Sequence, residues 1–227
     1  MGKKKKVMML LLTMLLLLAG ACTAHANTDN FTLSGKTYKI KRSRTACAST
    51  LYRKTASGWM KVAKTSNGSL EFVGKYRSTA VFWGISPTEK NGAYHSLWTY
   101  KAGSKELVRH GVYVSGQIKG KYVIGHALPA FYDQRYMKAC IFNIASYKYK
   151  TISKASVAPA VISNKIYYTK YAKGYLYIMR CNLDGSKAKT LKKIKTGKVI
   201  YAEATFTKTY CDLSINRSGK TTRYYYK

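Results

Sequence analysis

Short runs of β-forming residues dominate the chain after residue 30. These runs are rich in Tyr, Val, Ile, Thr and Trp, and Gly, Asn and Ser interrupt them at short intervals. No stretch of helical length places apolar residues at positions i, i+3, i+4 and i+7. The hydrophobic pattern therefore predicts an all-β fold.

A turn of Gly or Asn followed by Lys recurs ahead of predicted strands. Its copies are Gly35-Lys36, Gly74-Lys75, Gly120-Lys121, Asn164-Lys165 and Gly197-Lys198, spaced 33 to 46 residues apart. β-forming residues come two and four positions after the Gly or Asn, as Tyr122 and Ile124 do. This spacing puts both side chains on one face of a strand. The recurrence predicts a repeat of small sheets.

A second turn follows each of these strands. Its copies are Ser57-Gly58, Gly103-Ser104, Ala145-Ser146, Asp184-Gly185 and Ser218-Gly219. Pairs such as Asp-Gly supply the positive φ that a tight hairpin requires. Two turn types in a fixed order predict about four strands in roughly 40 residues, the size of a propeller blade. The fifth unit is expected to be short, because only one strand fits between Asp184-Gly185 and Gly197-Lys198.

We therefore expect residues 27–227 to form a single β-propeller-like domain. The predicted architecture is an array of about five short four-stranded units, with a five-bladed propeller as the closed form. Two alternatives stay open, namely an incomplete propeller that closes by self-association and a generic β-sandwich whose turns are Gly-Lys in a Lys-rich chain.

Residues 161–194 resemble a known repeat. Ile166-Tyr167-Tyr168-Thr169-Lys170 is followed by Leu176-Tyr177, by Asn182-Leu183-Asp184-Gly185-Ser186 and by Leu191. This order is similar to one repeat of the YWTD propeller of low-density-lipoprotein-receptor type, and in particular to bacterial exported propeller-like domains of unknown function. The resemblance implies that the aromatic run is an inner-blade strand and that Leu-Asp-Gly is a hairpin between outer strands. Lys170 stands where the YWTD motif has its Asp, and no binding residue is carried over.

The first 26 residues have the pattern of a signal peptide. Lys3 to Lys6 form a basic start, and an apolar run from Val7 to Ala21 follows it. This run is short for a membrane-spanning helix, although a retained anchor is the alternative. Ala24-His25-Ala26 matches the small-x-small signal that predicts cleavage after Ala26.

A lipobox is a second processing route. Leu18-Ala19-Gly20-Ala21-Cys22 resembles that motif, with Cys22 as the lipidated residue. Ala19 occupies the position where a lipobox usually has Leu. Both routes predict an extracytoplasmic protein, either secreted or associated with the cell envelope.

The chain has 41 Lys and Arg but only 8 Asp and Glu, a net charge of +33. Loss of Lys3 to Lys6 with the leader leaves +29, so the charge belongs to the folded part. Solubility needs far less charge, and self-repulsion opposes folding. A field of this size attracts polyanions. For an exported protein these are anionic cell-wall polymers, glycans and lipid headgroups, and nucleic acid is not the expected partner.

Cations alternate with tyrosines along the predicted strands, as in Tyr147-Lys148-Tyr149-Lys150. Such alternation places aromatic rings on one face and cations on the other. The residues predicted to bind polyanions are Lys148, Lys150, Lys192, Lys193, Arg223 and Lys227. The alternative is that each Tyr packs against the sheets while each Lys only solvates the surface.

Motifs for catalysis are absent from the sequence: it has no GxSxG, HExxH, P-loop or GxGxxG. A longer irregular segment places Asp133 seven residues after His126, and this pair is the predicted loop site. His95, His110 and His126 could meet on a propeller axis and hold a metal, but isolated histidines are more often structural. We expect no metal and no cofactor.

Four cysteines follow the leader, namely Cys47, Cys140, Cys181 and Cys211. They form no CxxC motif, which disfavours a zinc ribbon or a thioredoxin-type site. Export would permit disulfides in any of three pairings, but the wide spacing also suits free buried thiols, which we favour.

The sequence thus favours a non-enzymatic exported domain that binds anionic envelope or extracellular polymers through a basic, Tyr-rich surface. A scaffold that binds a specific envelope protein is one alternative. A glycan-active enzyme is another, with His126, Asp133 and Glu203 as its candidate residues.

Overall fold

The computed structural model describes residues 29–43, 47–85, 95–111, 115–127, 137–199, 202–215 and 220–226. All regular elements in these ranges are strands, and they form five antiparallel sheets, each built from strands consecutive in the sequence. None of the described residues belongs to a helix with the length and apolar character needed to cross a membrane.

The first two sheets have four strands each. The first sheet contains β1 (Asp29–Leu33), β2 (Lys36–Arg42), β3 (Ser49–Thr55) and β4 (Gly58–Thr65). The second contains β5 (Ser69–Tyr76), β6 (Thr79–Ile85), β7 (His95–Lys101) and β8 (Val108–His110).

Two more four-stranded sheets and a smaller one follow. The third sheet contains β9 (Ser115–Lys119), β10 (Tyr122–Ala127), β11 (Lys138–Asn143) and β12 (Lys148–Ser153). The fourth contains β13 (Ala160–Ile162), β14 (Lys165–Ala172), β15 (Tyr175–Asn182) and β16 (Lys189–Lys195). The fifth has three strands: β17 (Ala202–Phe206), β18 (Tyr210–Ile215) and β19 (Thr221–Tyr225).

The core lies between successive sheets. Each of the four hydrophobic clusters of the described residues joins one sheet to the next. In the second sheet Phe82 packs towards the first sheet, while its neighbour Val81 packs towards the third. In the third sheet Val123 and Ile124 divide in the same way between the second and fourth sheets. The period of two in a strand therefore gives each middle sheet two apolar faces.

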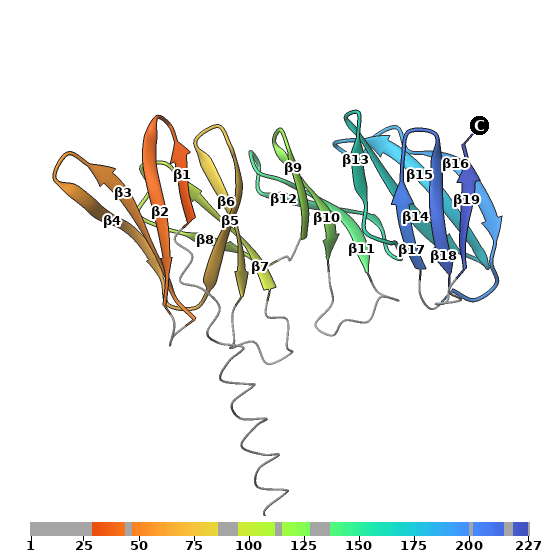
Figure 1. Cartoon of the computed structure of the whole chain (residues 1–227), viewed down its shortest axis with the longest axis horizontal. Helices are drawn as coiled ribbons and strands as arrows, with labels where there is room; N and C mark the ends of the chain where they lie inside the picture. The colour runs from red at the N-terminus through yellow and green to blue at the C-terminus, as the bar shows by residue number, and fades with distance from the viewer. Residues whose placement is uncertain are drawn as a thin grey trace, which may run out of the picture.

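The sheets form an open, propeller-like array. The first strands of the first four sheets contact one another in order: β1 contacts β5, β5 contacts β9 and β9 contacts β13. In Figure 1 the first and fifth sheets lie at opposite ends of the long axis. These two end sheets each have one face in a described hydrophobic cluster, and the other face is polar.

The all-β class and the array of about five units are confirmed. The prediction of a short fifth unit is also correct. The single strand between Asp184-Gly185 and Gly197-Lys198 is β16, and it belongs to the fourth sheet, so the fifth sheet has only three described strands.

Two copies of the Gly-Lys turn differ from the prediction, and the predicted Ser218-Gly219 turn lies outside the described residues. Gly197-Lys198 connects the fourth sheet to the fifth, and Val199 after it is not in a strand. Gly74-Lys75 lies inside β5, next to an irregularity in its pairing with β6, and the hairpin comes later, at Arg77-Ser78. The glycine serves a different purpose. A Cβ at Gly74 would lie 2.8 Å from Ile118 Cδ1, so its absence lets β5 approach β9 closely. Gly35, Gly120 and Asn164 do occupy hairpins with positive φ, as predicted.

Candidate functional site

The predicted polyanion-binding residues lie on the last strands of three sheets. Lys148 and Lys150 are on β12, Lys192 and Lys193 are on β16, and Arg223 is on β19. Each of these strands forms the edge of its sheet. The residues therefore form a series of basic edges along the array rather than one compact patch (Figure 1). Lys227 lies outside the described residues.

On the edge of the fourth sheet, cations and aromatic rings share a face. Lys193 Nζ lies 4.1 Å from the ring centroid of Tyr175 and 5.9 Å from that of Tyr177. Tyr177 is the cross-strand partner of Lys193. The expectation that aromatics and cations occupy opposite faces is therefore wrong here. It holds along one strand, but antiparallel pairing places a residue of the neighbouring strand beside each ring.

Lys150 joins the third sheet to the fourth. Its Nζ donates to the backbone carbonyl oxygen of Asp184 at 3.2 Å. The Asp184 carboxylate is occupied within its own turn, because Oδ1 accepts from the backbone nitrogen of Ser186 at 2.8 Å. Hydrogen bonds from Ser186 lower the pKa of Asp184. Asp184 is thus a turn residue. Lys150, predicted to bind polyanions, also contributes a hydrogen bond between the third and fourth sheets.

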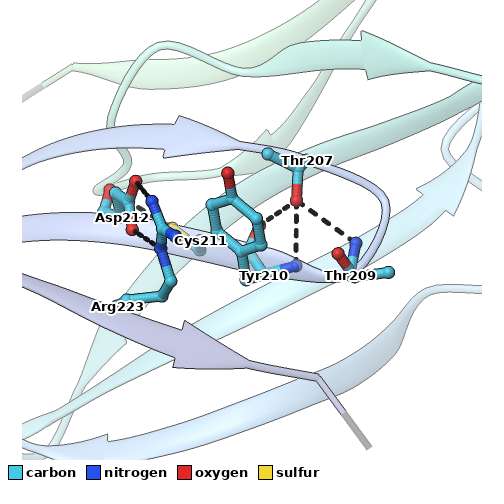
Figure 2. A network of polar contacts seen from close by, with 6 residues as sticks. All are labelled: Thr207, Thr209, Tyr210, Cys211, Asp212 and Arg223. Carbon is cyan, nitrogen blue, oxygen red and sulfur yellow. Dashed lines mark hydrogen bonds and ion pairs between the residues drawn. The ribbon is translucent and has the colours of Figure 1, made fainter.

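Arg223 is paired with a carboxylate. Its Nε and Nη2 donate to the two carboxylate oxygens of Asp212, both at 2.8 Å, and its guanidinium lies 4.0 Å from the ring centroid of Tyr210. Figure 2 shows this pair beside the turn held by Thr207, whose hydroxyl accepts from the backbone nitrogen of Tyr210 at 2.9 Å. The hydrogen bonds from Arg223 lower the pKa of Asp212. The pair balances the charge of Arg223.

The histidines occupy different surroundings. His110 Nε2 is 2.9 Å from Thr99 Oγ1, and its ring lies 4.8 Å from Phe142 and 5.0 Å from Tyr147. Burial lowers the pKa of His110 and of His126. Within the described part of the chain, no group of three or more His, Cys, Asp or Glu is placed to hold a metal ion.

Of the two residues of the predicted loop site, one lies in the described part of the chain. His126 is on β10, whereas Asp133 lies outside the described residues. Glu203, the third candidate for a glycan-active enzyme, is on β17 of the fifth sheet, whose described core packs against the fourth sheet, whereas β10 belongs to the third sheet. The structure does not bring His126 and Glu203 together.

A cavity of about 440 Å³ lies beside β17. Glu203 and Asp212 line this cavity together with hydroxyl-bearing and apolar residues. The other lining residues are Met137, Val157, Ala158, Ala202, Ala204, Thr205, Ser214 and Thr221. The Asp212 carboxylate is already bound by Arg223.

The four described cysteines are free thiols. Cys140, Cys181 and Cys211 are buried between sheets, and Cys47 is partly exposed. Burial raises the pKa of Cys140 to about 12, that of Cys181 to about 11 and that of Cys211 to about 12.

Sequence reasoning missed a basic and aromatic surface on the first sheet. Lys39 Nζ lies 4.2 Å from the ring centroid of Trp59, and Lys54 Nζ lies 5.4 Å from the same ring. The alternation of Tyr52 with Lys54 in the sequence was the available signal. Its partners Lys39 and Trp59 are brought to it only by strand pairing.

No protein-family model matches the sequence, and no curated protein does. Solved structures are similar to this chain at low identity. A prolyl endopeptidase aligns with 83% of this chain and 32% of its own, at 8% identity and a TM-score of 0.45. The Dos1 propeller aligns with 81% of this chain and 53% of its own, at 11% identity and a TM-score of 0.39.

TolB from Acinetobacter baumannii aligns with 79% of this chain and 48% of its own, at 10% identity and a TM-score of 0.34. The chain spans between about a third and three fifths of the length of these solved structures and of an uncharacterised Listeria monocytogenes protein. The likeness concerns the arrangement of strands, and no site residue is transferred from it.

Proposed function

We propose that this chain is an exported, non-enzymatic binding domain that contacts anionic polymers of the cell envelope or the extracellular space. Export would follow cleavage after Ala26 or lipidation of Cys22. The resemblance of residues 161–194 to YWTD-type repeats of exported bacterial domains supports this setting.

The observation that carries the proposal is the imbalance of charge. Without the leader and its four lysines, 37 of the 41 cationic side chains remain against 8 anionic ones, so most cations have no carboxylate partner however the chain folds. Many of them lie on edge strands, as Lys61 and Lys64 on β4 and Lys192 and Lys193 on β16 do. Their mutual repulsion opposes folding, and a bound polyanion would relieve it.

Lysines on edge strands also have a purely structural explanation. An unpaired strand edge invites pairing with another chain, and charged side chains prevent it. Protection of the strand edges requires charge on each edge but no ligand. A binding experiment therefore distinguishes the two explanations, because only the first proposal expects the protein to bind a polyanion.

The test is co-sedimentation of the purified protein with bacterial cell walls, native and stripped of their anionic polymers, across a salt series. Binding that is lost on stripping and falls steeply with salt supports the proposal. The absence of binding at low salt would refute it. Salt-insensitive binding to a single envelope protein would favour a scaffold instead.

A further inference from the structure

The outer face of the first sheet lies at the end of the array and packs against no other sheet among the described residues. The inner face of this sheet packs Phe31, Leu33, Tyr38, Ile40 and Leu51 against the second sheet. The opposite face points away from the array at one end of the long axis (Figure 1). Strand pairing assigns its residues, because cross-strand partners share a face.

Lysines and aromatic rings form rows across this face. Lys39 pairs with Tyr52, which pairs with Lys61. Lys41 pairs with Thr50, which pairs with Lys64. A third row pairs Lys54 with Trp59. Neighbouring strands lie about 4.8 Å apart, so adjacent members of a row are in contact range.

Among the residues that the structure describes, no carboxylate lies on this face. Its residues are Asn30, Thr32, Thr37, Lys39, Lys41, Thr50, Tyr52, Lys54, Trp59, Lys61 and Lys64. None of its lysines has a carboxylate partner among the described residues. A second copy of the same face would meet it with like charge, which opposes self-association here.

Lysine ammonium groups lie over the aromatic rings of this face. Lys39 Nζ lies over both rings, 4.2 Å from the centroid of Trp59 and 5.6 Å from that of Tyr52. Trp59 is 36% exposed and Tyr52 is half-buried. Single-stranded nucleic acid stacks successive bases on several exposed rings, whereas Trp59 is the one exposed ring among the described residues of this face, so the face does not favour such a partner.

We propose that this face binds a polysaccharide whose sugar rings carry carboxylates. A cation–π contact at an exposed site is weak, so a carboxylate can draw the Lys39 ammonium off the Trp59 ring. The apolar face of the sugar then takes the vacated place against the indole, while Lys54 and Lys61 pair with further carboxylates of the polymer. This inference rests on the proposed polyanion binding and names its surface and ligand class.

The test uses polygalacturonate as the probe, dextran as its uncharged counterpart and poly(dT) as the nucleic-acid counterpart. Binding is followed by affinity measurement and by iodide quenching of tryptophan fluorescence. A Trp59→Phe variant identifies the Trp59 signal, since the chain also contains Trp83 and Trp98. We expect polygalacturonate to protect Trp59 from iodide and dextran to leave it unprotected.

Two triple variants with equal loss of charge locate the site. Lys39→Ala/Lys54→Ala/Lys61→Ala should weaken polygalacturonate binding about tenfold and abolish the protection of Trp59. Lys192→Ala/Lys193→Ala/Lys195→Ala on β16 should weaken it about threefold or less and leave the protection intact. Circular dichroism checks that both variants keep the β fold.

The remaining outcomes overturn the inference. Equal losses in the two triple variants would show that binding follows net charge, which leaves the proposed function intact but removes this face as its site. Protection of Trp59 by poly(dT) at lower concentration than by polygalacturonate would reassign the face to nucleic acid. Absence of binding to any polyanion at low salt would refute the proposed function itself.

Discussion

Arg223 and Asp212 form a two-pronged ion pair across β18 and β19, with both nitrogen–oxygen distances at 2.8 Å. The pair neutralises Arg223, one of the cations predicted from the sequence to bind polyanions. The arginine also stacks against Tyr210, so its guanidinium is held in place by two neighbours.

Replacing Asp212 by Asn should release this cation. We expect the affinity for a polyanion to rise about two- to threefold, and the salt dependence to steepen by about one charge. Asp184→Asn is the matched control, because it removes the same charge from a carboxylate that accepts a hydrogen bond only within its own turn. An equal gain in both variants, measured by the same salt series, would contradict a specific role for Arg223.

His110 should make the stability of the protein fall as the pH is lowered. Burial lowers the pKa of His110 in the folded state below the ordinary value of 6.5. At a pH between the folded-state pKa and 6.5, the folded protein therefore holds fewer protons than the unfolded chain. The contribution of His110 to the free energy of unfolding therefore grows as the pH rises through this window and is lost as the pH falls through it.

His110→Gln keeps a polar atom near Thr99 and does not titrate. Its melting temperature should fall less between pH 7 and pH 5 than that of the wild-type protein. His126→Gln should have a similar effect, because burial also lowers the pKa of His126. Identical pH slopes in the wild type and the His110 variant would contradict the assignment.

The cysteines should differ in reactivity. Cys47 is partly exposed, whereas burial raises the pKa of Cys140, Cys181 and Cys211 to between about 11 and about 12. Since the thiolate is the reactive form, a maleimide at pH 7.5, about one unit below the ordinary thiol pKa, should label Cys47 first. Peptide mass spectrometry identifies the labelled residue, and labelling of all sites should require denaturant. Fast labelling of Cys140 in the folded protein would contradict its burial.

Gly84 should tolerate no side chain. A Cβ there would lie 2.5 Å from Trp98 Cδ1 and 2.8 Å from Leu70 Cδ2. Trp98 cannot easily move away, because it is buried and its Nε1 donates a hydrogen bond to Ser96 Oγ. Gly84→Ala should therefore cost about 1–3 kcal/mol of unfolding free energy in urea denaturation. Gly111→Ala is the control, because a Cβ there meets nothing within 4 Å. Both substitutions reduce the conformational entropy of the unfolded chain alike. The difference in unfolding free energy between the two variants therefore measures the steric clash at Gly84.

The fold was predictable because its signals are local. Hairpin turns such as Asp184-Gly185 and the alternation of residues within a strand can be recognised from a few neighbouring positions. The short fifth unit followed from the same spacing, since one strand cannot serve two sheets.

The sites were harder to predict because they depend on pairing between strands. Lys39 and Trp59 are 20 positions apart, and only the register of β2, β3 and β4 brings them together. Arg223 meets Asp212 in the same way. The role of Gly74 cannot be recognised from the sequence, because a glycine that permits close approach of strands looks the same there as a glycine in a turn.

The described residues form four hydrophobic interfaces between the five sheets, with the first and last sheets at opposite ends. Stability in such an array is approximately a sum of nearest-neighbour terms, as in solenoid proteins. The second, third and fourth sheets are each supported from two sides, whereas the end sheets are supported from one. Unfolding should therefore begin by fraying at the two ends and move inwards, with amide hydrogen exchange slowest in the third sheet. A polymer bound on the outer face of the first sheet would protect one of the two places where the molecule starts to come apart.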